Sequence, residues 1–334
     1  DILKIKHSDF YDDCGVRTVM IEIFSRFRDL IYHFLPLQYF YLIKVFKKHI
    51  QSDFKPDIFH SNVIFPAGIL GNWLSQKYKK PHIITEHWTR VRQFANMPVL
   101  SFWGKKAYNK AVRILPVSEF LKTEICKSFS ILDHNKFTII GNVIDSKLFY
   151  YKKKDSNPNE LRLCSIATWS YLKHPAKQPE LLIKAIAKVQ DSYPTKIKLT
   201  MIGGGNKVPE LIKLCETLKV DAEFTGYLPK NEIVKKLHES DFFVHPTNIE
   251  TFGVVVAEAI LTGTPVVCSD VSALRELVNN SNGLLCENTV EGWSNALLKI
   301  NVADFNNEKF ATEMENKFNI EAIGKKISSV YQSI

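Results

Sequence analysis

The sequence has no long uninterrupted apolar run and no paired cysteines. Its most apolar stretch, residues 30–46, is broken by a histidine, a proline, a glutamine and a lysine, so it is too short and too polar to cross a bilayer. The six cysteines lie at positions 14, 126, 164, 215, 268 and 286, without CxxC pairs or metal-ligand spacing. Free cysteines suit a reducing compartment, and no signal peptide is evident, so we expect a cytoplasmic protein.

Signatures of nucleic-acid binding are also missing. The chain carries 44 lysines and arginines against 35 acidic residues, but it has no aromatic RNA-binding motif, zinc-finger spacing or basic low-complexity tail. The formal charge of +9 therefore favours an anionic small molecule or a membrane surface over nucleic acid. Core material is plentiful, since 45% of the 334 residues are hydrophobic, and this length predicts two globular domains.

The second half of the chain alternates between short apolar runs and amphipathic stretches. The apolar runs, which predict strands, are 162–167, 197–202, 222–225, 241–246, 266–268 and 284–286. The stretches between or after them, which predict helices, are 180–189, 208–219, 231–239, 253–261, 273–278 and 290–300. Such regular alternation predicts right-handed βαβ units and a parallel sheet, and hence an α/β fold. The first half alternates less clearly, with strands expected at 57–60, 81–85 and 111–117 and helices at 67–78 and 119–129.

Two glutamates mark the most informative segment of the second half. Glu250 lies in the polar loop after the 241–246 strand, and Glu258 lies eight residues later, inside the next helix. Both belong to the C-terminal edge of the sheet, where open α/β folds bind ligands. Valine, alanine and isoleucine surround Glu258 in the sequence, and a carboxylate in such a stretch is rarely buried without a partner. A ligand hydroxyl would supply one.

The residues around these glutamates carry a family signature. The backbone N–H groups of Phe252, Gly253 and Val254, at the start of the helix, have no intrahelical partner and predict an anion site. With Phe-Gly after the first glutamate and Gly-Thr-Pro-Val-Val after the second, the segment resembles the Glu-x7-Glu motif of retaining nucleotide-sugar glycosyltransferases. The family it resembles is family four of that class, which has the GT-B fold.

The resemblance implies two Rossmann-like lobes with parallel sheets and an interdomain cleft. We expect an acceptor-side lobe over residues 1–145, a nucleotide-sugar-binding lobe over 146–318, and a helix over 319–334 that crosses back to the first lobe. The first lobe of the family normally opens with a strand and a glycine-rich loop, whereas residues 1–30 contain one glycine, Gly15. We therefore expect the first βα unit to be missing and the chain to be a fragment.

Lys177, just before the 180–189 helix, matches the lysine that holds the donor diphosphate in the family. A cation is unfavourable beside the positive end of a helix unless an anion lies there, which argues against the alternative of a solvated lysine. The arginine that the family places at the preceding strand exit is absent. We expect Lys173 to replace its charge.

A glycine turn and an aromatic residue are expected on the nucleotide. Gly203 and Gly204 follow the 197–202 strand and match the Gly-x-Gly of the family, which lets the chain pass close to the nucleotide. A tight turn is the alternative, and the complete dinucleotide fingerprint is absent. Tyr227, Leu228 and Pro229 lie where the family places its base-binding loop, so we expect the backbone of this loop to contact a uracil-type base.

Four further residues of the first half match family positions. His87 ends the 81–85 strand and matches a histidine that approaches the donor sugar near the reacting carbon. His60 matches another histidine at a strand end, and either histidine could instead be an ordinary satisfied polar residue. Ser118 and Glu119 match a Val-Ser turn, and we expect them to cap a helix rather than to catalyse.

The resemblance implies a retaining glycosyltransferase that uses a UDP- or GDP-sugar and a glycan or lipid-linked acceptor, in cell-envelope polysaccharide synthesis. Glu250 would contact the donor sugar and Glu258 the ribose, while Lys177 would stabilise the departing nucleoside diphosphate. No Asp-x-Asp motif is needed, so we expect neither a metal nor a cofactor. Two alternatives stay open: a GT-B-like sugar-nucleotide epimerase, and a non-catalytic nucleotide-sugar-binding protein.

The aromatic, basic stretch at residues 26–49 has two interpretations. It is either a buried helix with a basic outer face or a peripheral face that docks on anionic lipid. The second would place the protein at the inner face of the cell membrane.

Overall fold

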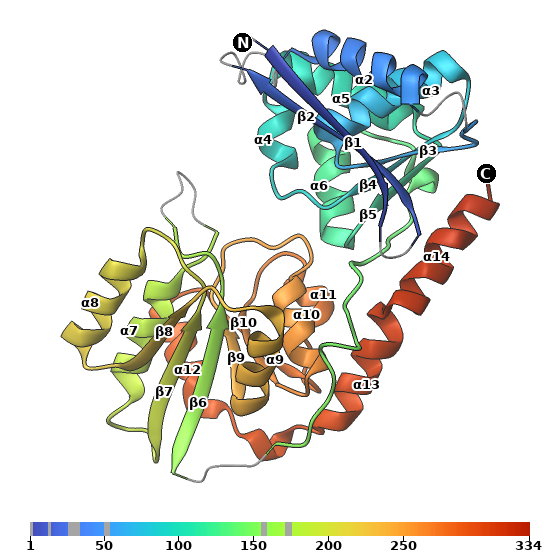
Figure 1. Cartoon of the computed structure of the whole chain (residues 1–334). Coiled ribbons are helices and arrows are strands. Elements are labelled where there is room, and N and C mark those ends of the chain that lie inside the picture. The colour runs from blue at the N-terminus through green and yellow to red at the C-terminus, as the bar shows by residue number, and fades with distance from the viewer. Residues whose placement is uncertain (1–2, 13–14, 26–33, 50–53, 155–158, 171–175) are drawn as a thin grey trace. The chain divides into compact units, whose positions relative to one another are not determined.

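The computed structural model of the chain describes residues 3–12, 15–25, 34–49, 54–154, 159–170 and 176–334. The described strands form three sheets, in the orders β1-β2, β3-β4-β5 and β11-β10-β9-β6-β7-β8. The chain divides into two compact units (Figure 1). Unit 1 comprises residues 1–84 and 102–112, and unit 2 comprises residues 85–101 and 113–334.

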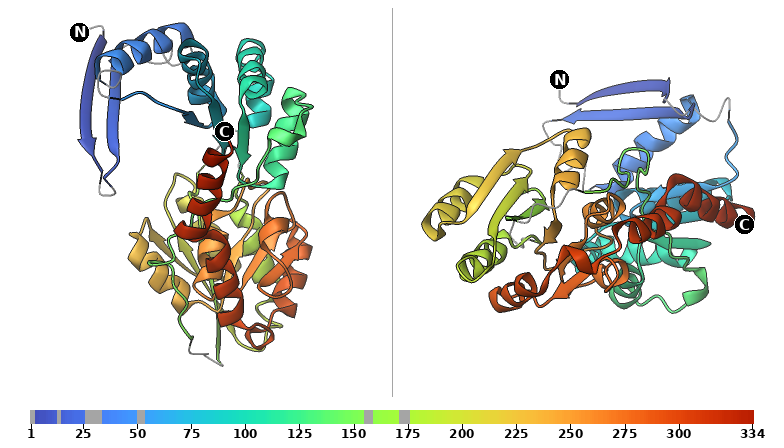
Figure 2. Two further views of the ribbon diagram at one scale, coloured as in Figure 1. Left: turned by 90° about the vertical axis from the view of Figure 1, so that its right-hand side faces the viewer. Right: turned by 90° about the horizontal axis from the view of Figure 1, so that it is seen from below.

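Unit 1 begins with an antiparallel ribbon to which the sequence analysis assigned no element. Strands β1 (Leu3–Tyr11) and β2 (Arg17–Ser25) pair along their whole length, as Figure 2 shows. Near the turn, Arg17 and Asp9 form an ion pair of 2.7 Å across the two strands. The Asp12 carboxylate accepts the Val16 N–H at 2.9 Å and closes the turn.

Helices linked by aromatic contacts make up most of the remainder of unit 1. The elements that lie wholly or partly in unit 1 are α2 (Leu35–His49), β3 (Phe59–Asn62), the π-helical turn η1 (Ile64–Gly68), α3 (Ile69–Tyr78), β4 (His82–Glu86) and α5 (Pro98–Lys110). The Trp73 ring meets Tyr39 and Trp103 edge-on at 5.1 and 5.2 Å, and so joins α3 to α2 and α5. In α2, Phe46 is buried but Phe40 is 62% exposed, so this helix is only partly covered.

Unit 2 contains the parallel sheet that the second half of the sequence predicts. Its strands are β6 (Glu160–Ile166), β7 (Lys196–Ile202), β8 (Asp221–Gly226), β9 (Phe242–His245), β10 (Val266–Ser269) and β11 (Gly283–Cys286), and neighbouring strands pair in parallel. Its helices include α7 (Pro179–Val189), α8 (Val208–Leu218), α9 (Lys230–Glu239), α10 (Val254–Leu261), α11 (Leu274–Leu277) and α12 (Val290–Lys299). Each boundary lies within two residues of the expected one, so the prediction is confirmed.

Further elements complete unit 2. They are α4 (Val91–Ala95), β5 (Arg113–Pro116), α6 (Glu119–Phe129), the single 3-10 turns η2 (His134–Lys136) and η3 (Val302–Asp304), α13 (Asn307–Phe318) and α14 (Ile320–Gln332). The Ser118 hydroxyl accepts the Leu121 N–H at 3.1 Å and caps α6, as the sequence predicted.

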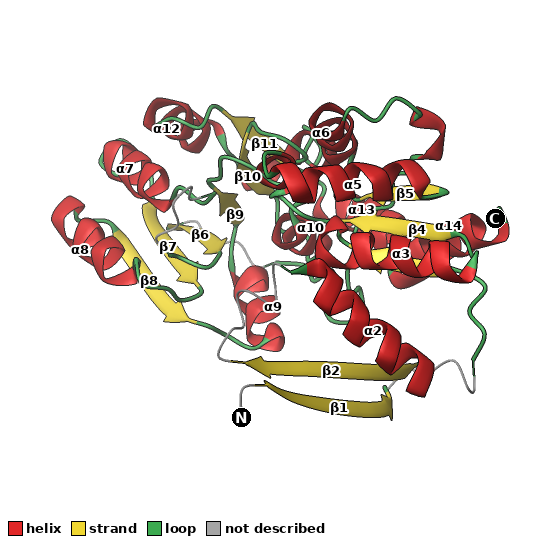
Figure 3. Ribbon diagram, turned by 90° about the horizontal axis from the view of Figure 1, so that it is seen from above, coloured by secondary structure: helices red, strands yellow, loops and turns green. Residues whose placement is uncertain are grey.

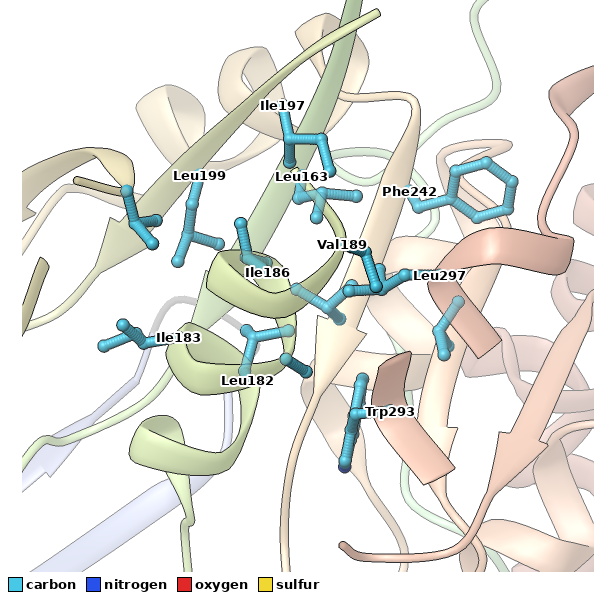
Figure 4. Packing of buried hydrophobic residues seen from close by; sticks show 14 of the residues in the cluster. Leu163, Leu182, Ile183, Ile186, Val189, Ile197, Leu199, Phe242, Trp293 and Leu297 are labelled. Carbon is cyan, nitrogen blue, oxygen red and sulfur yellow. The ribbon is translucent and has the colours of Figure 1, made fainter. Parts of the chain in front are cut away.

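The core of unit 2 lies between the sheet and its helices. Helices α7, α8 and α12 cover one face of the six-stranded sheet, while α9 and α10 lie on the other (Figure 3). On the first face, Leu182 and Ile186 of α7 and Trp293 and Leu297 of α12 are fully buried (Figure 4). Each aliphatic side chain so buried contributes about 1.5–3 kcal/mol. The strand ends, and the loops that leave them, therefore stand on a rigid support.

Candidate functional site

Glu250 lies in the loop between β9 and α10, and two nitrogen atoms hold its carboxylate. Lys177 Nζ forms an ion pair with Oε1, and His245 Nε2 lies 2.9 Å from the same oxygen. The Glu250 side chain is only 15% exposed. Burial alone would raise the pKa of this carboxyl, but the hydrogen bond with His245 and the charge of Lys177 outweigh burial and lower the pKa to about 2. Glu250 is therefore a carboxylate at every physiological pH.

Lys177 reaches Glu250 because two loops at this edge of the sheet pair with each other. Residues 176–178, before α7, meet residues 246–248, after β9, in an antiparallel bridge between Lys177 and Thr247. Backbone hydrogen bonds of 2.7 and 3.0 Å flank the bridge. Two predicted site residues that are 73 positions apart in the sequence are thus in direct contact.

His245 completes the cluster and is not among the site residues predicted from the sequence. It is the last residue of β9, its side chain is 1% exposed, and its Nε2 lies 3.0 Å from Lys177 Nζ. Its ring stacks on Phe243 with a centroid separation of 5.8 Å. Burial, and then the charge of Lys177, lower the pKa of His245, so the ring is neutral at physiological pH. The signal in the sequence was a histidine at the C-terminal end of a strand, the end that faces ligands in such folds.

Glu258 has the opposite surroundings. It lies within α10, is partly buried, and accepts no hydrogen bond from any residue that the structure describes. Burial raises the pKa of this carboxyl to about 7, against a weaker opposing effect of Lys230. The argument for a ligand hydroxyl as its partner therefore still applies.

The N-terminus of α10 lies between the two glutamates in the chain. Gly253 caps the helix with φ +91°, a conformation that favours glycine, and a Cβ there would lie 2.8 Å from Leu274 Cδ2. Phe252 is buried and Val254 is 39% exposed. The N–H groups of Phe252, Gly253 and Val254 donate no hydrogen bond to a described residue. These three groups can therefore bind an anion.

The glycines after β7 form a tight turn against the end of β6. Gly203 has φ +115°, its N–H donates to Gly226 O at 2.8 Å, and a Cβ there would overlap Ala167 O, so the turn itself requires this glycine. Tyr227, which is 71% exposed, packs on Gly204 and donates its hydroxyl to Gly204 O at 3.2 Å. Gly204 and Tyr227, both of which we expect close to the nucleotide, are therefore in contact.

A cavity of about 280 Å³ opens beside Lys177. Its lining consists of Thr168, Trp169, Ser170, Ala176, Lys177, Pro179 and Lys207. The Lys207 side chain is 14% exposed and forms an ion pair with Glu180. This lysine is not among the site residues predicted from the sequence, although it follows the glycine turn closely. Trp169 Nε1 is buried and has no hydrogen-bond partner among the described residues. Lys173, which we expect to supply a second positive charge, lies outside the described residues.

His87 lies against the loop that carries Glu250. Its carbonyl oxygen accepts the Thr251 hydroxyl at 2.9 Å, and its Nδ1 lies 2.9 Å from Asn142 Oδ1. Burial lowers the pKa of His87, although the hydrogen bond with Asn142 opposes this. His60 lies on β3, in unit 1.

Metal ligands do not cluster in the part of the chain that the structure describes. No group of three or more histidine, cysteine, aspartate and glutamate side chains that could hold a metal ion occurs there. The expectation of a metal-independent reaction stays a prediction. None of the described helices is long and apolar enough to cross a membrane.

The fold and the site together place the chain in a general class of proteins. It is an α/β protein with a charged ligand site at the C-terminal edge of a parallel sheet. Two family models identify the family. "Glycosyl transferases group 1" matches residues 152–318, half of the chain, and "Glycosyltransferase Family 4" matches residues 8–148. The chain belongs to the group 1 glycosyl transferases and is a glycosyltransferase enzyme.

Curated relatives agree with this assignment, and a solved structure shows the same fold. The uncharacterized glycosyltransferase MJ1178 of Methanocaldococcus jannaschii is 25% identical over 331 residues, which cover 93% of this chain and 87% of that protein. The alpha-monoglucosyldiacylglycerol synthase of Streptococcus pneumoniae is 25% identical over 84% of this chain and 67% of its own length. Anabaena Alr3699/HepE, solved in complex with UDP, superimposes with a TM-score of 0.73 at 17% identity, covering 90% of this chain and 82% of its own. The predicted GT-B fold class is confirmed.

Proposed function

We propose that this glycosyltransferase moves a sugar, with retention of configuration, from a nucleotide-diphosphate sugar to a glycan or lipid-linked acceptor. The cluster of Glu250, Lys177 and His245 beside the N-terminus of α10 carries the proposal, because it combines a fixed carboxylate with a cation and N–H groups that donate to no described residue. A reaction that expels a nucleoside diphosphate needs positive charge where negative charge develops. UDP is the favoured nucleotide, since the structural neighbour HepE was solved with it.

The nucleotide would bind on the side of Glu258. A ribose diol offers two hydroxyl donors, and a carboxylate that accepts no hydrogen bond from a described residue is a suitable acceptor for both. The exposed ring of Tyr227 and the backbone of Gly204 would hold the base. Ribose binding would also favour the ionised form of Glu258 and lower its pKa.

The diphosphate and the sugar would lie between Glu258 and Glu250. Lys177 and the N–H groups of Phe252, Gly253 and Val254 would bind the departing phosphate oxygens, and these groups supply the positive charge that a metal supplies in other sites. Glu250 would accept hydrogen bonds from the sugar hydroxyls, and His87 would lie near the reacting carbon. Attack from the same face as the leaving group would then give retention.

For the acceptor we favour a lipid-linked or cell-envelope glycan at the inner face of the membrane. One relative is named for the synthesis of a glycolipid, alpha-monoglucosyldiacylglycerol. In unit 1, Phe40 and Phe102 are each 62% exposed, and Lys106 Nζ lies 5.1 Å from the centre of the Trp103 ring. Exposed aromatic rings beside lysines suit an anionic lipid surface.

Release of nucleoside diphosphate from a panel of UDP- and GDP-sugars tests the function. We expect release with one donor, dependent on acceptor and unchanged by EDTA. Nucleotide binding without release from any donor would indicate the non-catalytic alternative, and acceptor-independent conversion of the donor would indicate an epimerase. Loss of activity in EDTA that added divalent metal restores would contradict the metal-independent mechanism.

Sedimentation with lipid vesicles tests the membrane face. We expect the chain to bind vesicles that contain anionic lipid, to bind neutral vesicles less, and to dissociate as salt rises. Phe102→Ser should reduce this binding severalfold. Leu298→Ser, which changes an apolar side chain 51% exposed on α12, is the matched control and should leave binding unchanged. Equal losses of vesicle binding in the two variants would contradict the assignment of the membrane-binding face to unit 1.

A further inference from the structure

The Nε2 atom of His245 lies between a hydrogen-bond acceptor and a hydrogen-bond donor. Its Nε2 lies 2.9 Å from Glu250 Oε1, which can only accept a hydrogen bond, and 3.0 Å from Lys177 Nζ, which can only donate one. A neutral imidazole nitrogen either carries a proton or offers a lone pair, so it can satisfy one neighbour at a time.

The surroundings select which neighbour is satisfied. The Lys177 ammonium has three N–H donors and is 26% exposed, so water can accept those that Glu250 does not. The Glu250 carboxylate, in contrast, is only 15% exposed and depends more on protein donors. A lone pair on Nε2 would face the Glu250 carboxylate and repel it. The tautomer with the proton on Nε2 removes this repulsion and gives Glu250 a second hydrogen-bond donor.

Glu250 depends on these two donors. Lys177 and His245 are the side chains that contact its carboxylate among the residues that the structure describes. If Lys177 turns to bind a phosphate oxygen, one donor is left, and a buried carboxylate without any donor is strongly disfavoured. His245 is well placed to remain, since it belongs to strand β9 and stacks on Phe243.

We propose that His245 is a positioning residue, which keeps the Glu250 carboxylate in place through Nε2–H when Lys177 turns to the diphosphate of the sugar donor. The inference rests on the proposed function, because it takes from it that Lys177 binds the diphosphate and that Glu250 contacts the sugar. It adds a separate role for each residue: Lys177 moves between the Glu250 carboxylate and the diphosphate, and His245 stays with the carboxylate.

Two substitutions at this position separate positioning from packing. His245→Leu removes the donor, and we expect kcat to fall about 10- to 100-fold while the Kd for UDP changes less than about threefold. His245→Gln keeps an N–H near the Nε2 position and should recover kcat to within about threefold of wild type. His238→Gln, a change at a histidine that contacts Tyr150 outside the site, is the matched control and should leave kcat unchanged.

The pattern of losses decides the proposal. Equal kcat losses in His245→Leu and His245→Gln, with both variants melting at the wild-type temperature, would overturn it. So would a loss in His245→Leu that appears only in the Kd for UDP. If His245→Leu does not fold, the comparison of His245→Gln with wild type and the tautomer measurement still decide.

The tautomer is measurable without turnover. Nitrogen-15 NMR of labelled protein, with the His245 signals assigned by their loss in His245→Gln, should show the proton on Nε2 in the nucleotide-free protein. A proton on Nδ1 would overturn the proposal whether or not the protein transfers sugar. Conversely, a proton on Nε2 in a protein that releases no nucleoside diphosphate from any sugar donor would count against the proposed function and leave the geometry of His245 intact.

Discussion

Glu250 and Glu258 lie eight residues apart, yet their carboxylates meet opposite surroundings. Glu250 sits in a loop, contacts two nitrogen atoms and has a pKa lowered to about 2, since His245 and Lys177 outweigh its burial. Glu258 sits inside α10, has no hydrogen-bond donor among the described residues and has a pKa raised by burial to about 7. Glu250 therefore has its hydrogen-bond donors without a ligand, whereas Glu258 has none among the described residues.

The difference assigns separate tasks to two residues of the same type. A carboxylate that the protein already orients can meet a reacting sugar without further rearrangement. A buried carboxylate without donors gains most from a ligand that brings them, as a ribose does. We therefore expect loss of Glu250 to affect the reaction and loss of Glu258 to affect nucleotide binding.

Glu250→Gln tests this division most severely. We expect transfer to fall about 1000-fold, because the neutral amide can no longer stabilise the positive charge that develops on the sugar. The Kd for UDP should stay within about threefold of wild type. Nucleoside diphosphate release and calorimetric titration with UDP measure the two effects.

Glu291→Gln is the matched control for this change. Glu291 also forms an ion pair with a lysine, Lys188, but its side chain is 67% exposed, so its loss should change neither quantity. If Glu250→Gln instead lost UDP binding and kept the kcat of wild type, the two glutamates would have exchanged their assigned tasks.

Lys177→Met removes the group that Glu250 and the diphosphate would share. We expect UDP to bind about 100-fold more weakly, because a charged partner of the phosphates is lost. The free energy of unfolding should also fall by about 2–3 kcal/mol, since Glu250 keeps one donor where it had two. Lys188→Met, at the exposed pair with Glu291, should do neither. Wild-type UDP affinity in Lys177→Met would remove this lysine from the donor site.

The sequence predicts much of this arrangement for local reasons. Buried parallel strands are short apolar runs, and their ends are marked by glycine, proline or polar residues, so the strands and helices predicted between residues 160 and 300 fall within two residues of expectation. The positions of Glu250 and Glu258, at the ligand edge of the sheet, follow from the same pattern.

What the sequence does not predict depends on contacts between distant residues. The ion pair of Lys177 with Glu250 requires two loops 73 positions apart to meet, and no local pattern contains that information. The sequence shows His245 only as a residue at the end of a strand, and its role depends on contacts with Lys177 and Glu250. The β1-β2 ribbon lies where the family places a glycine-rich βα unit, so the resemblance does not predict an antiparallel pair there.

Glu258→Gln should weaken UDP binding about 10-fold at pH 8, because an amide accepts less strongly from the ribose hydroxyls than a carboxylate does. In wild type, binding should also weaken as the pH falls below about 7, where the carboxyl takes up a proton. The variant has no such proton to gain. The difference between the two pH profiles, measured by titration with UDP, isolates Glu258, and identical profiles would rule out its contact with the ribose.

The same carboxyl should make the ligand-free protein less stable at high pH. Its folded-state pKa of about 7 exceeds the ordinary value of 4.5, so its contribution to stability is fully present below about pH 4.5 and is lost as pH rises through 7. The pKa difference corresponds to about 3 kcal/mol. Glu258→Gln should therefore gain stability over wild type, by about 3 kcal/mol at pH 8 and about 1 kcal/mol at pH 5. Denaturant unfolding at the two pH values checks this, and an equal gain at both would contradict it.

Tyr227 should show the smallest effect, and it extends the comparison to the base. Its ring is 71% exposed, and its hydroxyl donates to Gly204 O at 3.2 Å. Tyr227→Ala removes the surface on which the base would rest, so we expect the Kd for UDP to rise about fivefold while kcat stays unchanged. Tyr227→Phe keeps the ring and should stay within about twofold of wild type, since the lost hydrogen bond is exposed to water. A kcat loss in Tyr227→Ala without a change in Kd would put this residue on the side of Glu250, and the division between the two glutamates would not extend to the base.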